Sequence, residues 1–101
     1  PVLKEQIEKI VFEVIKDIND ELENENLENP TVGTKLFGEG GALDSLALVS
    51  VITDIEEAVH DAFDKYITIA DEKAMSMKHS PFSTVGTLTA YVESLLIASR
   101  V

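Results

Sequence analysis

Apolar residues recur every three or four positions over residues 2–23, with charged residues between them. This spacing predicts a helix with one buried stripe. The stripe consists of Leu3, Ile7, Ile10, Val11, Val14, Ile18 and Leu22. Residues 24–43 lack the period and contain four of the five glycines together with several asparagines. Because these residue types favour turns, we expect a long loop there, held on the core by Leu36, Phe37 and Leu43.

A second helical period runs from Ser45 to about Phe63. An advance of about 100° per residue places one apolar arc toward the core. That arc comprises Leu48, Val51, Ile52, Ile55, Val59, Ala62 and Phe63. The opposite arc is polar and largely acidic, with Ser50, Thr53, Asp54, Glu57, Asp61 and Asp64. Leu46 and Val49 are apolar yet lie beside Ser45 on this projection, so we expect both side chains to be exposed.

The remaining third of the chain predicts a short helix and a final long one. Ile67, Thr68 and Ile69 alternate like a strand that has no partner strand, so we expect an extended loop leading into a short helix over Asp71–Met77. The final helix begins after Ser83 or Thr84 as N-cap. Its expected buried residues are Val85, Leu88, Tyr91 or Val92, and Leu95. The pattern therefore predicts one all-α domain over residues 1–101, with three main helices and a short one.

Charge and cysteine content exclude several classes of function. The 101 residues include 8 basic and 19 acidic side chains, a formal net charge of −11. Such a surface repels nucleic acid and anionic lipid and attracts proteins that carry Lys or Arg patches. The absence of cysteine excludes disulfides and thiolate metal sites, as expected of a cytoplasmic protein. No apolar run reaches the roughly 18 residues of a membrane span, so we expect no membrane insertion.

The segment richest in candidate chemistry is the glycine-rich loop over residues 36–44 that leads into Ser45. Unpaired backbone N–H groups and the helix dipole at a helix start both favour a phosphate group. A serine at this position is also exposed enough to be modified. The alternative is that Asp44 or Ser45 only caps the helix, since both residue types are common N-caps.

The triplet Asp44-Ser45-Leu46, its glycine-rich loop and the acidic stretch Asp54, Glu56 and Glu57 resemble the acyl carrier proteins and their peptidyl-carrier relatives. The resemblance covers nearly the whole chain and implies a four-helix bundle of acyl-carrier type. It also implies that the protein is a carrier and not an enzyme. It implies that a separate phosphopantetheinyl transferase attaches 4′-phosphopantetheine covalently to Ser45, flanked by Asp44 and Leu46. The thiol of that group would hold an acyl group as a thioester for fatty-acid, lipid or specialised (polyketide-like) biosynthesis.

The resemblance also implies roles for the neighbouring residues. Asp44 matches an aspartate associated with transferase recognition and metal-assisted attachment. The expected partner contacts are Leu46, Val49, Asp54, Glu56 and Glu57, of which the acidic ones would meet basic patches on loading ligases and downstream synthase or transferase enzymes. We expect a cytoplasmic monomer without a metal site of its own.

Two departures from the fatty-acid carriers favour a specialised pathway. Ala47, Leu48 and Ser50 stand where those carriers have further acidic residues, which predicts a less charged surface near Ser45. The stretch between the second and the last long helix is also longer than in those carriers, and we expect the extra residues within Ala70–Phe82. A cavity for the cargo is expected between the second long helix and the short helix, lined by Val51, Ile55, Val59 and Met75.

Other interpretations of the same residues are open. One is a peptidyl or D-alanyl carrier, and another is an acidic helical interaction module without a prosthetic group. A serine hydrolase is disfavoured, because His60 and His79 are distant from Ser45 in sequence and the Gly-x-Ser-x-Gly pattern is missing. We expect His60 at the solvent edge of its helix. The acidic residues over 21–28 lack the ligand spacing of an EF-hand, so we expect a solvated helix end there, with weak divalent-ion binding as the alternative.

Overall fold

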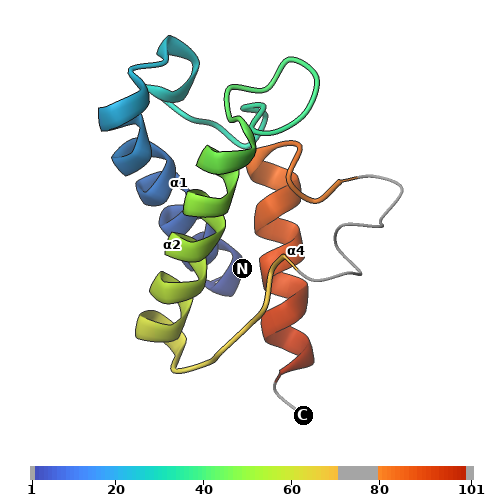
Figure 1. The fold of residues 1–101 in the computed structure, drawn as a ribbon. Helices are drawn as coiled ribbons and strands as arrows, with labels where there is room; N and C mark the ends of the chain where they lie inside the picture. Colours follow the sequence, from blue (N-terminus) through green and yellow to red (C-terminus); the bar gives the residue numbers. More distant parts are fainter. Residues whose placement is uncertain (1, 71–79, 100–101) are drawn as a thin grey trace.

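Three α-helices and one short 3-10 helix form the regular structure of residues 2–70 and 80–99, which the computed structural model describes (Figure 1). The elements are α1 (Val2–Leu22), η1 (Glu25–Leu27), α2 (Ser45–Phe63) and α4 (Val85–Ala98). The β-type pairing in these ranges consists of isolated bridges, so the predicted all-α class is confirmed for them. The short helix predicted over Asp71–Met77 lies outside the described residues.

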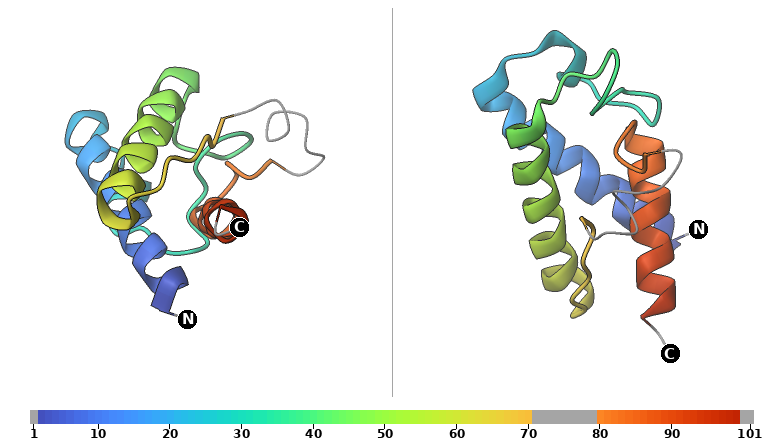
Figure 2. Two further views of the ribbon diagram at one scale, coloured as in Figure 1. Left: turned by 90° about the horizontal axis from the view of Figure 1, so that it is seen from below. Right: turned by 45° about the vertical axis from the view of Figure 1, so that its right-hand side comes forward.

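Helix α1 packs against both α2 and α4 and forms one wall of the core (Figure 2). Its fully buried side chains are Ile7, Val11 and Ile15, spaced by four residues. Ile15 was not in the predicted stripe, and Leu22 from that stripe is 39% exposed. The difference arises because the buried sector of α1 faces two partner helices, and it ends before the last turn.

Helix α2 has the predicted bounds, Ser45 and Phe63. Its C-cap Asp64 has φ 55° and donates its N–H to the His60 carbonyl over 2.9 Å, which ends the helix. Leu48, Val51, Ile52, Ile55 and Val59 are buried, as the helical projection predicts. Ala62 is exposed, contrary to that projection, because the last turn of α2 extends past the core.

Helix α4 begins after Thr84, one of the two predicted N-caps. The Thr84 hydroxyl accepts the Thr87 N–H over 3.1 Å, and the Thr84 N–H donates to the Thr87 hydroxyl over 3.0 Å. Leu96 is buried and Leu95 is only partly buried, whereas the sequence analysis expected Leu95 in the core. The pattern could not separate the two because α4 is apolar around most of its circumference. Neither α4 nor any other described helix combines the length and apolar surface needed to cross a membrane.

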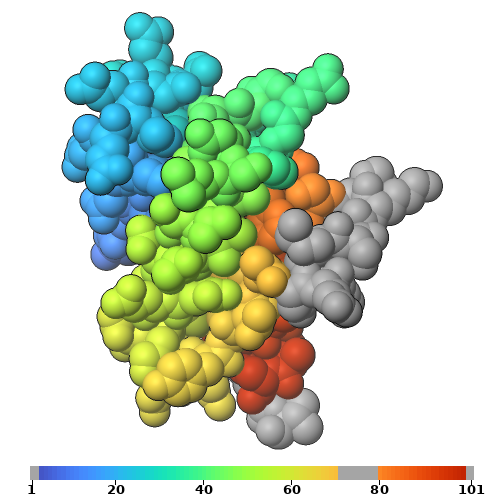
Figure 3. Space-filling model, viewed as in Figure 1, coloured from blue at the N-terminus to red at the C-terminus, as the bar shows by residue number. Residues whose placement is uncertain are grey.

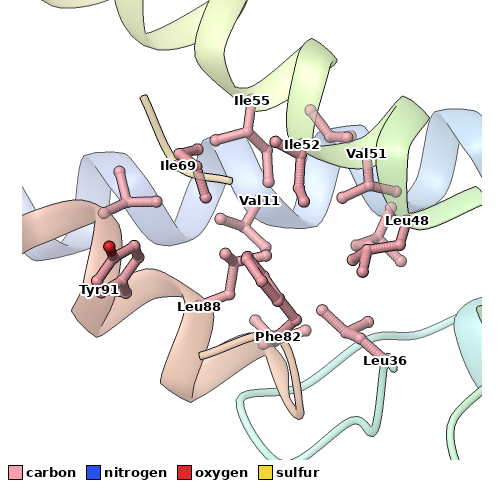
Figure 4. Close-up of a cluster of buried hydrophobic side chains, with 14 of the residues drawn as sticks. Val11, Leu36, Leu48, Val51, Ile52, Ile55, Ile69, Phe82, Leu88 and Tyr91 are labelled. Carbon is pink, nitrogen blue, oxygen red and sulfur yellow. The ribbon is translucent and has the colours of Figure 1, made fainter. Parts of the chain in front are cut away.

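The space between α2 and α4 is filled by side chains from the connections (Figure 4). Ile69 is fully buried and Phe82 is 3% exposed, and both contribute to the same core as Val11 and Leu88. The segment 64–70 runs back from the end of α2 and covers this side of the core (Figure 3). Within the described residues, Ile67–Ile69 forms no strand, in agreement with the expected extended loop.

Candidate functional site

Helix α2 begins directly after the glycine-rich loop, and Asp44 is its N-cap. The Asp44 backbone is extended (φ −85°, ψ 179°), and its Oδ1 accepts the Ala47 N–H over 2.7 Å. The Asp44 carbonyl accepts the Leu48 N–H over 2.9 Å, which starts the helical hydrogen bonds. Of the two caps that the sequence allowed, Asp44 is therefore the one used.

Ser45 is the first residue of α2 and is exposed. Within the described part of the chain, the Ser45 hydroxyl makes no hydrogen bond. The N–H groups of Ser45 and Leu46 precede the first intrahelical hydrogen bond, so they and the positive end of the helix dipole face the same way. A phosphodiester on Ser45 would lie next to these donors.

The loop before Ser45 is fixed at both ends. Leu36 is fully buried and Leu43 is 5% exposed, and the Leu43 N–H donates to the Leu36 carbonyl over 2.8 Å. The Leu36 N–H in turn donates to the Ser83 carbonyl over 2.7 Å, which ties the loop to the segment before α4. The expectation that Leu36 and Leu43 hold the loop on the core is confirmed, and Phe37 is partly buried against them.

Of the three glycines in this loop, Gly38 and Gly41 are required for different reasons. Gly38 has φ 101°, a left-handed conformation that other residues rarely adopt, and its carbonyl accepts the Gly41 N–H over 3.0 Å. A Cβ atom on Gly41 would lie 2.5 Å from the Leu36 carbonyl oxygen. The close approach of these two backbones therefore requires glycine at 41.

The predicted partner contacts lie along one side of α2. Leu46 is 78% exposed and Val49 is 59% exposed, as the helical projection predicts for both. Asp54 and Glu57 are also exposed. Glu56 is half-buried instead, and its Oε2 accepts the Ile69 N–H over 2.8 Å. Glu56 therefore has a structural role within the domain.

Two of the residues expected to lower the charge of the surface near Ser45 are in the core, and for Leu48 the helical projection already predicts burial. Ala47 is 8% exposed and Leu48 is 6% exposed. They lie on the side of the first turn that faces the core, so they do not set the charge of the surface around Ser45. Of the three positions where acidic residues are missing, Ser50 is the one that is exposed.

Three of the four residues expected to line a cargo cavity are packed inside the core. Val51, Ile55 and Val59 have no exposed surface. Met75, the fourth expected lining residue, lies outside the described residues.

His60 differs from the expected solvent-edge position. Its ring stacks on Tyr66 with the centroids 3.9 Å apart, and its buried Nδ1 has no hydrogen-bond partner among the described residues. The left-handed Asp64 turns the chain so that Tyr66 returns over the helix end. Fifteen residues of helix, about 22 Å, separate His60 from Ser45, which is too far for a base to activate the serine.

Two hollows between α1 and α2, of about 370 and 240 Å³, add residues that the sequence analysis missed. Besides the expected Asp54 and Glu57, they are lined by Glu13, Asp17 and Glu21 of α1. The i, i+4, i+8 spacing of these three was the available signal, because it places them on one helix face. That spacing alone did not show that the face adjoins α2.

Comparisons with known proteins do not assign the site. No protein-family model, no curated protein and no solved structure matches this chain. The described residues also contain no group of three or more His, Asp or Glu side chains that could hold a metal ion. What the site offers chemically is an exposed hydroxyl at the start of a helix, next to a capping carboxylate and an exposed leucine.

Proposed function

We propose that this domain is an acyl carrier protein in which Ser45 carries 4′-phosphopantetheine as a phosphodiester. The observation that supports the proposal best is the position of Ser45. Its hydroxyl is exposed at the first residue of α2 and makes no hydrogen bond within the described part of the chain.

The residues around Ser45 fit the group. The free N–H donors at the start of α2 suit its phosphate. Asp44 uses Oδ1 to cap the helix, and its Oδ2 makes no hydrogen bond to the described residues, which leaves it available to a transferase or its metal ion. When attached, phosphopantetheine supplies the thiol that holds an acyl group.

The role of the chain in this proposal is to present and orient, not to catalyse. The fixed loop and the capped helix hold Ser45 at one end of the domain. His60 is at the opposite end of the same helix, so Ser45 has no adjacent base on α2. The three described α-helices are compatible with a four-helix carrier bundle, whose short helix remains a prediction.

The surface beside Ser45 is suited to brief contacts with partner enzymes. Leu46 and Val49 present apolar surface, while Asp54 and Glu57 present charge further along α2. We expect a phosphopantetheinyl transferase, a loading ligase and downstream enzymes with basic patches to dock here, in a salt-sensitive manner.

A labelling assay tests the proposal. The protein is incubated with a fluorescent coenzyme A analogue, magnesium and a broad-specificity phosphopantetheinyl transferase, and label is read on a denaturing gel. We expect the parent and Ser50→Ala to be labelled and Ser45→Ala to remain unlabelled. Folded parent that stays unlabelled beside a labelled control carrier would contradict the proposal and favour an interaction module without a prosthetic group.

A further inference from the structure

A continuous groove runs between α1 and α2. Asp17 and Asp54 line both hollows described above, so the two hollows are halves of one feature, here called the α1–α2 groove. It extends over residues 10–21 of α1 and 49–61 of α2. At a rise of about 1.5 Å per residue, its length is roughly 16–18 Å, or three helical turns.

The groove is lined by carboxylates from both helices. Six carboxylate side chains line it, and all of them are exposed. Within the described part of the chain none of them forms an ion pair. They are Glu13, Asp17, Glu21, Asp54, Glu57 and Asp61. Among the described residues, no Lys, Arg or His lines either hollow. The negative charge is therefore left for an external partner to neutralise.

Apolar side chains line the same groove. They are Ile10, Val14, Ile18, Val49 and Ala58. Val49 is 59% exposed at the end nearest Ser45, and Ile10 and Ile18 are only partly buried. The groove thus offers apolar contact area between two acidic rims.

We propose that the α1–α2 groove is a docking site for a cationic amphipathic helix of a partner protein. The carboxylates are spread along two helices and do not converge on a metal-binding cluster among the described residues, so an extended array of positive charges matches them better than a single ion. Side chains of one helix pack well into the groove between two others. The apolar stripe of the partner helix would lie on Val49 and Ile18. Lysines or arginines at i, i+4 spacing would reach Asp17 and Glu21 on one side and Asp54 and Glu57 on the other.

This inference extends the partner surface proposed above from α2 to α1. Val49, Asp54 and Glu57 belong to both surfaces, but docking in the groove does not require Ser45 to be modified. Its test therefore uses the protein without the prosthetic group, and failure of labelling at Ser45 would leave it unaffected.

The probe is a synthetic peptide of about 18 residues, long enough to be helical, with a leucine stripe flanked by lysines. Its Kd is measured by fluorescence anisotropy at low salt, against the parent and two folded double variants. Asp17→Asn with Asp54→Asn removes one carboxylate from each side of the groove. Asp20→Asn with Glu28→Gln removes two exposed carboxylates outside it. We expect the groove pair to raise the Kd about tenfold and the control pair less than twofold.

A second peptide with the same composition but a scrambled sequence tests the amphipathic pattern. We expect it to bind at least about fivefold more weakly, because its apolar residues no longer form a stripe. Equal binding of the two peptides, equal effects of the two variant pairs, or no binding to the parent would overturn the proposal. The first two results would indicate diffuse attraction to the net charge.

Discussion

The backbone N–H of Ile69 donates a 2.8 Å hydrogen bond to Oε2 of Glu56, thirteen residues earlier in the chain. Ile69 itself is fully buried between α2 and α4. One side chain of α2 therefore fixes the returning segment that closes the core.

Removal of this acceptor should destabilise the fold. Glu56→Ala leaves the partly buried Ile69 N–H without a partner, and we expect it to lower the free energy of unfolding by about 1.5–3 kcal/mol. Glu56→Gln keeps an acceptor and should cost less. Urea denaturation measures both, with the exposed Glu57→Ala as the control, expected to change stability by less than about 0.5 kcal/mol. Equal effects of Glu56→Ala and Glu57→Ala would contradict this role.

Replacement of Asp44 by alanine should destabilise the fold more than replacement of Ser45. Asp44→Ala removes the cap on the Ala47 N–H, and we expect a loss of about 1 kcal/mol in the free energy of unfolding. Ser45→Ala should change it by less than about 0.5 kcal/mol, because the hydroxyl caps nothing. A larger loss for Ser45→Ala than for Asp44→Ala in thermal or urea unfolding would show that the cap is assigned to the wrong residue.

Gly38 and Gly41 should differ in their tolerance of alanine. Gly38→Ala forces a left-handed conformation on a residue with a Cβ, at a cost of about 1–2 kcal/mol, but meets no neighbouring atom. Gly41→Ala places its Cβ 2.5 Å from the Leu36 carbonyl oxygen, so the loop itself must move. We expect Gly41→Ala to be the more destabilising and to shift the amide NMR signals of residues 36–44. Unchanged signals would rule out the close approach.

Replacement of two threonines on α4 by valine should change stability in opposite directions. The Thr89 hydroxyl is buried without a hydrogen-bond partner among the described residues, so Thr89→Val should raise the free energy of unfolding by about 1 kcal/mol. The Thr87 hydroxyl accepts the Thr84 N–H and donates to the Pro81 carbonyl, so Thr87→Val should lower stability by about 1 kcal/mol. Calorimetry on both variants checks the opposite signs. A destabilising Thr89→Val would mean that its hydroxyl has a partner.

Local signals in the sequence predicted the helices well. Capping side chains limited the cap of α2 to Asp44 or Ser45 and that of α4 to Ser83 or Thr84. The structure uses Asp44 and Thr84. The exposure of Leu46 and Val49 followed from helical geometry alone, because their angular positions do not depend on what α2 packs against.

Contacts between distant residues could not be predicted in the same way. The bond from Ile69 to Glu56 and the stacking of Tyr66 on His60 both depend on the path of the chain after Asp64, which no periodicity encodes. The groove likewise required knowledge that the acidic face of α1 adjoins α2. Within α4, Leu95 and Leu96 are both apolar, so only the packing of the helix decides which one is buried.

The most direct test of the central claim is the intact mass of the protein after incubation with coenzyme A, magnesium and a phosphopantetheinyl transferase, followed by fragment mapping. We predict a mass increase equal to one phosphopantetheine group, located on Ser45, and no increase for Ser45→Ala. A folded parent with unchanged mass, or a group located on another residue, would contradict the account.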